Sequence, residues 1–449
     1  MSTEDKMTIE ERYKYLRLMK KRYVNTSRKE KGQLLDEMEE VTGLHRKSLV
    51  RLINSPLKRK ARSKERGRTY QHDFDAALRV IDESFDYLCA ERITPNLAWM
   101  AQHLEAHGEL RLPPRVREQL ETVSVSTVRR RQRRFRKHLH IPRLPRKKPS
   151  GPKLTQDIPM LRLSWDLAEP GHLETDLVHH CGPTAAGQYV CTLQMVDVAT
   201  GWSERVAVLG RGGVVMEDAF RRILRRLPFP ILEIHPDNGS EFFNHHMLRF
   251  WGEIVQGVTL SRSRPFHKND NPHIEQKNST LVRAYLGNER LDTVAQTIAT
   301  NVLYDKMWVY YNLFQPVMHL DEKEFFPEEG QPLQRVKRRY DQAQTPFDRL
   351  CATEAILPHH RQQLDALRHR TNPRRLRQAI YDDIERLFAL PGAAPDTTEN
   401  IYHTLMDQMD PKEGHLDLLA FDFNRTPLKD NDSPEESTRQ PATSAKTRA

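Results

Sequence analysis

Apolar residues recur at helical spacing through the first third of the chain and form strand-like runs after it. The helical spacing predicts helices over about residues 8–22, 27–40 and 45–53, with Thr42-Gly43 breaking the chain before the third. Helix, glycine turn and short basic helix is the order of a helix-turn-helix unit, whose last helix enters the major groove of DNA. An ordinary helical hairpin has the same pattern.

A second helical segment follows and ends in an arginine-rich helix predicted for residues 127–139. Thr94-Pro95 is a good N-cap and N1 pair for the helix before it. Ser124 or Ser126 can cap the arginine-rich helix. We interpret residues 70–140 as a second helical DNA-binding unit, with a merely solvated arginine face as the alternative.

The strand-like runs predict a mixed α/β domain. Three strands come first and are joined by turn residues, and two more strands then alternate with helices. The strands are expected at 172–180, 188–198, 202–209, 231–235 and 258–264, and the helices at 217–227, 241–254 and from about 272 and 293.

These patterns predict a multidomain α+β protein, in which N-terminal all-α helix-turn-helix units precede a mixed α/β core and a C-terminal region of uncertain fold. The expected units are 1–56, 70–140 and 160–320, joined by linkers at 57–69 and 141–159. Residues 321–423 are expected to be partly helical, with helix over 358–390 and a basic stretch at 333–349 that can contact DNA. The tail, 424–449, is polar and charged and is expected to be disordered.

Charge is concentrated at the front of this 449-residue chain. Residues 1–150 hold 36 Lys and Arg against 20 Asp and Glu, whereas the whole chain has a net charge of +10. Such a basic front third is typical of a nucleic-acid-binding arm. No apolar run is long enough to span a membrane, no signal peptide is apparent, and the four cysteines are scattered, so we expect a cytoplasmic protein without a zinc module.

Two carboxylates stand where a sheet has no structural need for them. Asp176 lies inside the apolar strand LETDLV, and burying it there is costly unless a cation neutralises it. Asp237 follows the strand ILEI and a His-Pro pair, although Asp-Asn-Gly is also a favourable turn.

A third carboxylate, Glu275, falls in the first turn of a helix that Pro272 opens. Asp270 in the preceding loop is the alternative. Three carboxylates from three elements form a hard-oxygen site suited to Mg²⁺, and two such ions can serve phosphoryl transfer. We therefore predict Asp176, Asp237 and Glu275 as catalytic and metal-binding residues.

The ordered set ETD, DVATGW, HPDNGSEF and NDNPHIE resembles the retroviral-type integrase catalytic core of the DDE transposases, with bacterial insertion-sequence transposases the nearest group. Sixty residues separate Asp176 from Asp237, and 37 separate Asp237 from Glu275, close to the spacing usual in that superfamily. The resemblance covers about 165–320, and the helix-turn-helix units also match that group. The zinc module of retroviral integrases is absent.

This resemblance implies a ribonuclease-H-like fold, Mg²⁺ or Mn²⁺ as cofactor, and a homo-oligomer on double-stranded DNA that brings together transposon ends and target. The predicted activity is cleavage at element ends and joining to target DNA. Two alternatives are a nuclease that does not join and a non-catalytic DNA-binding regulator. Predicted DNA contacts are Arg46, Lys47, Arg51, Arg129, Arg130, Arg133, Lys268 and Lys277.

Overall fold

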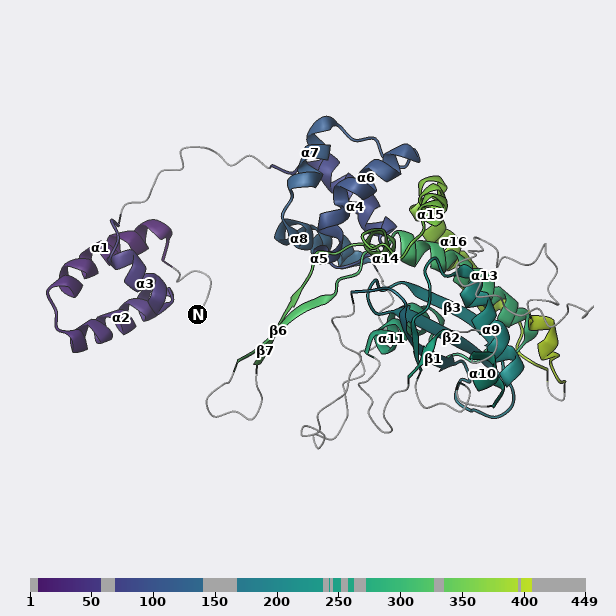
Figure 1. Ribbon diagram of the computed structural model, residues 1–449. Coiled ribbons are helices and arrows are strands. Elements are labelled where there is room, and N and C mark those ends of the chain that lie inside the picture. Colours follow the sequence, from purple (N-terminus) through teal and green to yellow (C-terminus); the bar gives the residue numbers. More distant parts are fainter. Residues whose placement is uncertain are drawn as a thin grey trace, which may run out of the picture. The chain divides into compact units, whose positions relative to one another are not determined.

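The computed structural model describes residues 7–57, 69–139, 168–236, 242, 245–251, 257–261, 272–326, 335–394 and 397–405. The chain divides into two compact units, Met1–Thr69 and Tyr70–Ala449 (Figure 1). Most of the two predicted linkers and the whole predicted tail lie outside the described residues. Within the described ranges, no helix is both long and apolar enough to cross a membrane.

The described residues of the N-terminal unit form three helices, α1 (Ile9–Val24), α2 (Arg28–Thr42) and α3 (Arg46–Ile53), as the sequence predicts. Ser27 caps α2 in a capping box with Glu30, in which each side chain accepts from the other's backbone N–H. Gly43 ends α2 with a φ of +65°, a conformation that glycine adopts without strain. The turn then leads directly into α3.

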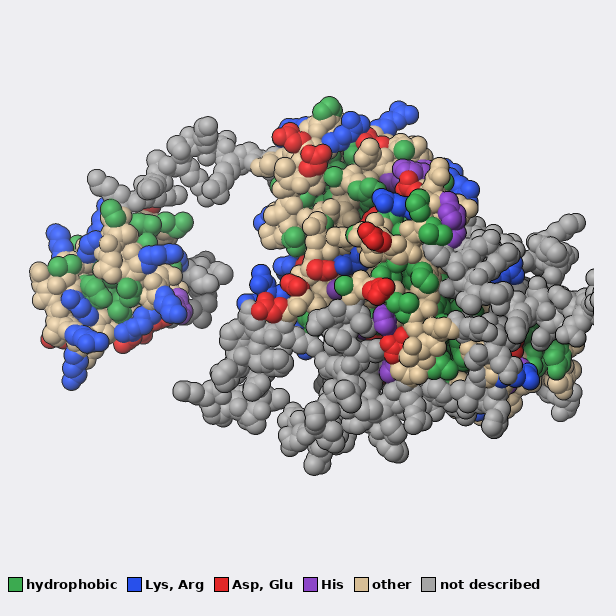
Figure 2. Space-filling model, viewed as in Figure 1, with side chains coloured by type: hydrophobic (Ala, Val, Ile, Leu, Met, Phe, Trp, Pro, Cys, Tyr) green, Lys and Arg blue, Asp and Glu red, His purple; other side chains and the backbone are tan. Residues whose placement is uncertain are grey.

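One small core holds these three helices together. Its buried side chains come from every helix and are Leu16, Met19, Leu34, Leu35, Met38, Leu49, Ile53 and Leu57. Lys and Arg side chains are frequent on the face of this unit that Figure 2 displays. The unit is therefore a compact three-helix body with a basic surface.

The larger unit begins with a helical segment, α4 (His72–Ser84), α5 (Ala90–Ile93), α6 (Leu97–Ala106), α7 (Pro114–Thr122) and α8 (Val125–Phe135). The predicted cap at Thr94-Pro95 is wrong. Both residues belong to a 3₁₀ turn between α5 and α6, and the Thr94 hydroxyl donates back to the carbonyl of Ala90 at 2.6 Å. Ser124 caps α8, because its side chain accepts from the N–H of Thr127.

A five-stranded mixed sheet, in the order β3-β2-β1-β4-β5, forms the centre of this unit. Strands β1 (His172–His179), β2 (Val190–Asp197) and β3 (Ser203–Leu209) are antiparallel, whereas β4 (Glu233–Pro236) and β5 (Thr259–Leu260) run parallel to β1. The expected mixed α/β architecture is confirmed. Helix α9 (Gly213–Arg226) starts four residues earlier than predicted, with Gly212 as its N-cap.

Helix α13 (Val294–Leu313) closes the outer edge of β3. Asn301 accepts from the N–H of Ala207 at 2.8 Å and donates to its carbonyl at 2.9 Å, and Asn312 makes the same pair of bonds with Ser203. The edge groups of a sheet would otherwise stay open to another strand. Two other helices, α10 (His245–Arg249) and α12 (Ala284–Leu286), are short.

The C-terminal region forms a hairpin, β6 (Leu320–Phe326) and β7 (Arg335–Tyr340), followed by α14 (Pro346–Cys351), α15 (Pro358–Arg370) and α16 (Pro373–Ala389). The predicted helix over 358–390 is confirmed as two helices. Helix α16 contacts the helical segment through Arg374, which reaches Glu83 and Glu109. Tyr310 of α13 also donates to the carbonyl of Ser84 at 2.7 Å. One hydrophobic core therefore includes the helical segment, the sheet and α13–α16.

Candidate metal site and DNA-binding surfaces

The first turn of helix α11 (Pro272–Lys277) is attached to strand β1 by a buried carboxylate. Glu174 Oε2 accepts from the backbone N–H of Ile274 at 2.8 Å, and the N–H of His273 also donates to this carboxylate. The first N–H groups of a helix lack partners within it, so a carboxylate is well placed there. Burial raises the pKa of Glu174 to about 8, against these two hydrogen bonds.

Asp176 lies two residues further on the same face of β1 and meets the same helical stretch. Its Oδ2 accepts from the side-chain amide of Asn278, while Oδ1 accepts from the N–H of Leu177 at 2.8 Å. Glu275 is exposed and precedes Asn278 by three residues, a spacing that puts two side chains on one side of a helix. The structure thus brings the helix face that bears Glu275 to the strand that bears Asp176.

Strand β4 approaches the same place. Its last residue, Pro236, pairs with Thr175, the neighbour of Asp176. The next residue, Asp237, lies outside the described residues, as do Lys268 and Asp270. Within the described part of the chain, no group of three or more His, Cys, Asp or Glu side chains is arranged to hold a metal ion.

Asp176 on β1 and Glu275 on α11 are of the residue type that a hard divalent ion takes as ligands. Both carry carboxylate oxygens, which Mg²⁺ prefers, and both side chains are at least partly open to solvent. Glu174, in contrast, is buried and engaged by α11, so it positions the helix. Sequence reasoning missed Asn278, although its three-residue spacing from Glu275 could have indicated it.

The Asp197 in the DVATGW motif has a structural role. Its carboxylate accepts from the N–H groups of Gly171 and Thr200, each at 2.8 Å, and from the Thr200 hydroxyl at 2.6 Å. Gly201 turns the chain with a φ of +74°. This motif therefore shapes the turn between β2 and β3.

The three basic residues predicted on α3 differ in their environment. Arg46 forms an ion pair with Asp36 of α2 and donates to the carbonyl of Gly32 at 3.2 Å. Lys47 and Arg51 are exposed and lie one turn apart, on one side of the helix. The structure thus makes Arg46 a brace between helices and leaves Lys47 and Arg51 on the surface.

The arginine-rich helix α8 uses part of its charge internally. Arg131 and Arg134 pair with Asp75, Arg136 pairs with Asp82, and Arg129 pairs with Glu91 on the surface. Arg129, Arg130 and Arg133, the predicted DNA contacts, are exposed, and so is Arg134. The ion pairs explain much of the arginine content, and DNA contact by Arg129, Arg130 and Arg133 stays a prediction.

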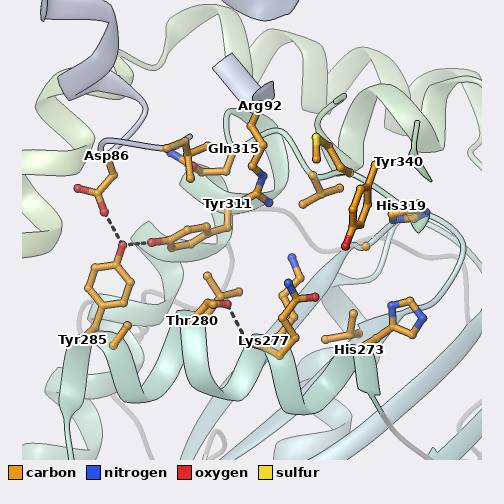
Figure 3. Close-up of a pocket in the computed structure, with 18 of the residues that line it drawn as sticks. Asp86, Arg92, His273, Lys277, Thr280, Tyr285, Tyr311, Gln315, His319 and Tyr340 are labelled. Atoms are coloured by element: carbon orange, nitrogen blue, oxygen red, sulfur yellow. Dashed lines mark hydrogen bonds between the residues drawn. The ribbon is translucent and has the colours of Figure 1, made fainter. Parts of the chain in front are cut away.

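Lys277, the remaining predicted DNA contact, points into a pocket (Figure 3). Burial, together with the guanidinium groups of Arg92 and Arg205, lowers the pKa of Lys277 to about 7. Its side chain lies on a different side of α11 from Asn278, which faces β1. DNA contact by Lys277 also stays a prediction.

The sheet order, with three antiparallel strands followed by two strands parallel to the first, fits a ribonuclease-H-like fold. No model of a known protein family matches the chain. The chain is 33% identical over 305 residues to the uncharacterized protein y4rM of Sinorhizobium fredii, an alignment that covers 67% of this chain and 86% of that protein. It belongs to the same family as y4rM.

Among solved structures, the chain is similar to the catalytic core domain of BIV integrase, with 14% identity, a TM-score of 0.20, and coverage of 26% of this chain and 68% of that one. It is also similar to the HTLV-2 integrase catalytic core domain in complex with magnesium, in its dimeric form. There the identity is 16%, the TM-score 0.23, and the coverage 33% of this chain and 90% of that one.

Proposed function

We propose that this protein is a DNA transposase that cuts at element ends and joins them to target DNA in a reaction that requires divalent metal ions. One observation carries the proposal. The hydrogen bond from Asn278 to Asp176 holds the Glu275 side of α11 against β1, next to the point where β4 leads into Asp237.

The residues Asp176, Asp237 and Glu275 would hold Mg²⁺ or Mn²⁺, as two ions, where β4 ends beside the middle of β1. Such ions supply charge neutralisation at a phosphodiester and favour in-line displacement. The chain itself provides the positioning. Glu174 fixes the start of α11, and Asn278 sets the orientation of the Asp176 carboxylate.

Basic surfaces support DNA as the substrate. Lys47 and Arg51 of α3, and Arg129, Arg130 and Arg133 of α8, are exposed. The order of α2, Gly43 and α3 is that of a helix-turn-helix unit, which reads the major groove with its last helix. A protein that binds specific ends and acts as a multimer needs such a unit more than a simple nuclease does.

A strand-transfer assay tests the proposal, with DNA from the flanks of the gene as donor and a plasmid as target. We expect wild-type protein with Mg²⁺ or Mn²⁺ to give joined products, and Asp176→Asn, Asp237→Asn and Glu275→Gln each to abolish them. Asp270→Asn is the matched control and should stay active. Hydrolysis without joining would favour the nuclease, and DNA binding without any cleavage would favour the non-catalytic regulator.

A further inference from the structure

A pocket of about 790 Å³ lies against α11 (Figure 3). His273, Lys277 and Thr280 follow one another at spacings of four and three residues and line it together, as residues on one helix face do. The other walls include α5, Val196 of β2, the end of α13, the β6–β7 hairpin and α16. Its volume suits a small organic ligand.

The described lining of this pocket has more positively than negatively charged side chains. Arg92, Lys277 and Arg338 line it, against a single carboxylate, Asp86, among its described lining residues. Asp86 is already engaged, because it accepts from Arg377 Nε at 2.8 Å and from the hydroxyl of Tyr285 at 2.7 Å. It therefore has little capacity left to neutralise the cations.

Some buried hydrogen-bond donors in or next to the wall have no acceptor among the described residues. Gln315 lines the pocket and is only 4% exposed, and its Nε2 has no hydrogen-bond partner in the described part of the chain. Arg205 lies outside the lining, with its Cζ 5.4 Å from the ring centre of Tyr311, which is a lining residue. None of its three side-chain nitrogens has a hydrogen-bond partner among the residues that the structure describes. Buried donors without acceptors are costly and uncommon in folded proteins, so the Gln315 amide calls for an acceptor from outside the described part of the chain.

We propose that this pocket is a binding site for a phosphate group, which Arg92, Lys277 and the Gln315 amide contact directly. Figure 3 shows Arg92 and Lys277 entering the same space from opposite walls. A guanidinium and an ammonium together match the charge of a phosphate and its several acceptor oxygens. Arg205 adds positive potential from behind Tyr311.

The phosphate can belong to a small free ligand or to a DNA strand, and both have the same recognition chemistry. In either case the ligand would contact the face of α11 that lines the pocket, and through α11 it would hold Glu275 in place. This consequence rests on the proposed function, whereas the binding site itself does not.

Calorimetric titration of the full-length protein with inorganic phosphate and with pyrophosphate, in buffer with EDTA, tests the site. We expect pyrophosphate to bind wild-type protein, and Arg92→Gln to weaken binding by about tenfold or more, the loss typical of one charged hydrogen-bonding group. Arg111→Gln is the control, since it removes the same charge from an exposed position outside the pocket. Asp176→Asn should bind like wild type, so failure of the catalytic proposal leaves this result intact.

Gln315→Leu provides a second variant in case Arg92→Gln fails to fold, and it should also weaken pyrophosphate binding. Competition with a short DNA duplex distinguishes the two possible sources of the phosphate group. Displacement of pyrophosphate by DNA assigns the phosphate to a strand, and independent binding assigns it to a small ligand. The proposal is overturned if millimolar phosphate and pyrophosphate both fail to bind, or if Arg92→Gln and Arg111→Gln have equal effects.

Discussion

The candidate site depends on the side chain of one uncharged residue, Asn278. Its amide donates to Asp176 Oδ2, so one carboxylate oxygen points in a fixed direction. Outer hydrogen-bond partners of metal ligands commonly change metal affinity or activity by about 10–100-fold. We therefore regard Asn278 as a positioning residue.

Replacing Asn278 by Ala should lower the cleavage rate by about tenfold and raise the Mg²⁺ concentration needed for half of the maximal rate. The reason is that Asp176 loses the bond that orients it. Cleavage assays across a Mg²⁺ series measure both effects. Ser279→Ala, an exposed neighbour, is the control. If the two variants need the same Mg²⁺ as wild type, Asn278 has no positioning role.

His180 makes stability depend on pH. It is fully buried, its Nε2 contacts the Thr192 hydroxyl at 2.8 Å, and burial lowers its pKa to about 3 from 6.5. The unfolded chain protonates this imidazole at a higher pH than the folded protein does. As the pH falls below the unfolded-state pKa, protonation therefore favours the unfolded state and stability is lost. Acidification from pH 6.5 to 5 should thus cost about 2 kcal/mol through His180.

The His180→Gln variant should lose correspondingly less stability than wild type over that interval. Chemical denaturation at pH 7, 6 and 5 measures the difference. Gln cannot titrate, and it keeps a group that can bond to Thr192. Parallel losses in both proteins would show that His180 does not titrate in this way.

At the scale of elements, the strands β1, β2 and β3 could be predicted to within two residues, because buried strands give continuous apolar runs. The start of α9 was missed because Gly212-Gly213 resembles a loop, although Gly212 is the N-cap. The β6–β7 hairpin was missed too. Its strands are highly charged, as in LDEKEFF and RVKRRY, and such strands lack the apolar pattern.

Only part of the candidate site could be predicted from the sequence, because some of its contacts join residues that are far apart in the chain. An acid inside an apolar strand identifies Asp176 from local sequence alone. The attachment of α11 to Glu174, and the contact of Asn278 with Asp176, join residues about 100 positions apart. No local pattern encodes such a pairing, so it required the fold.

The capping box of α2 gives a prediction for this element. Ser27→Ala removes the side chain that accepts from the N–H of Glu30, which should destabilise the helix by about 1 kcal/mol. Hydrogen exchange of α2 amides in the full-length protein measures the loss. Lys29→Ala, an exposed change in the same turn, should have little effect. Equal exchange in the two variants would argue against the cap.

At the scale of the whole molecule, different substitutions should affect DNA binding and catalysis. Lys47→Ala and Arg51→Ala should each weaken binding to end DNA and reduce the slope of log affinity against log salt by about 1, if each contacts a phosphate. Arg46→Ala should mainly destabilise the N-terminal unit, because Arg46 braces α3 against α2. Binding measured at several salt concentrations, beside thermal unfolding, distinguishes these effects. If Arg46→Ala mainly weakened DNA binding, while Lys47→Ala and Arg51→Ala mainly lowered stability, α3 would not be the helix that contacts the major groove.

A Mn²⁺ titration followed by electron paramagnetic resonance tests most directly whether Asp176 and Glu275 share divalent metal ions, as we propose. Wild-type protein should bind Mn²⁺, while Asp176→Asn and Glu275→Gln should each weaken binding by about tenfold or more, because each removes a charged oxygen ligand. Glu289→Gln, a change outside the site, should bind like wild type. Wild-type protein that binds no Mn²⁺ at millimolar concentration, or a Glu275→Gln variant that binds as tightly as wild type, would contradict the claim.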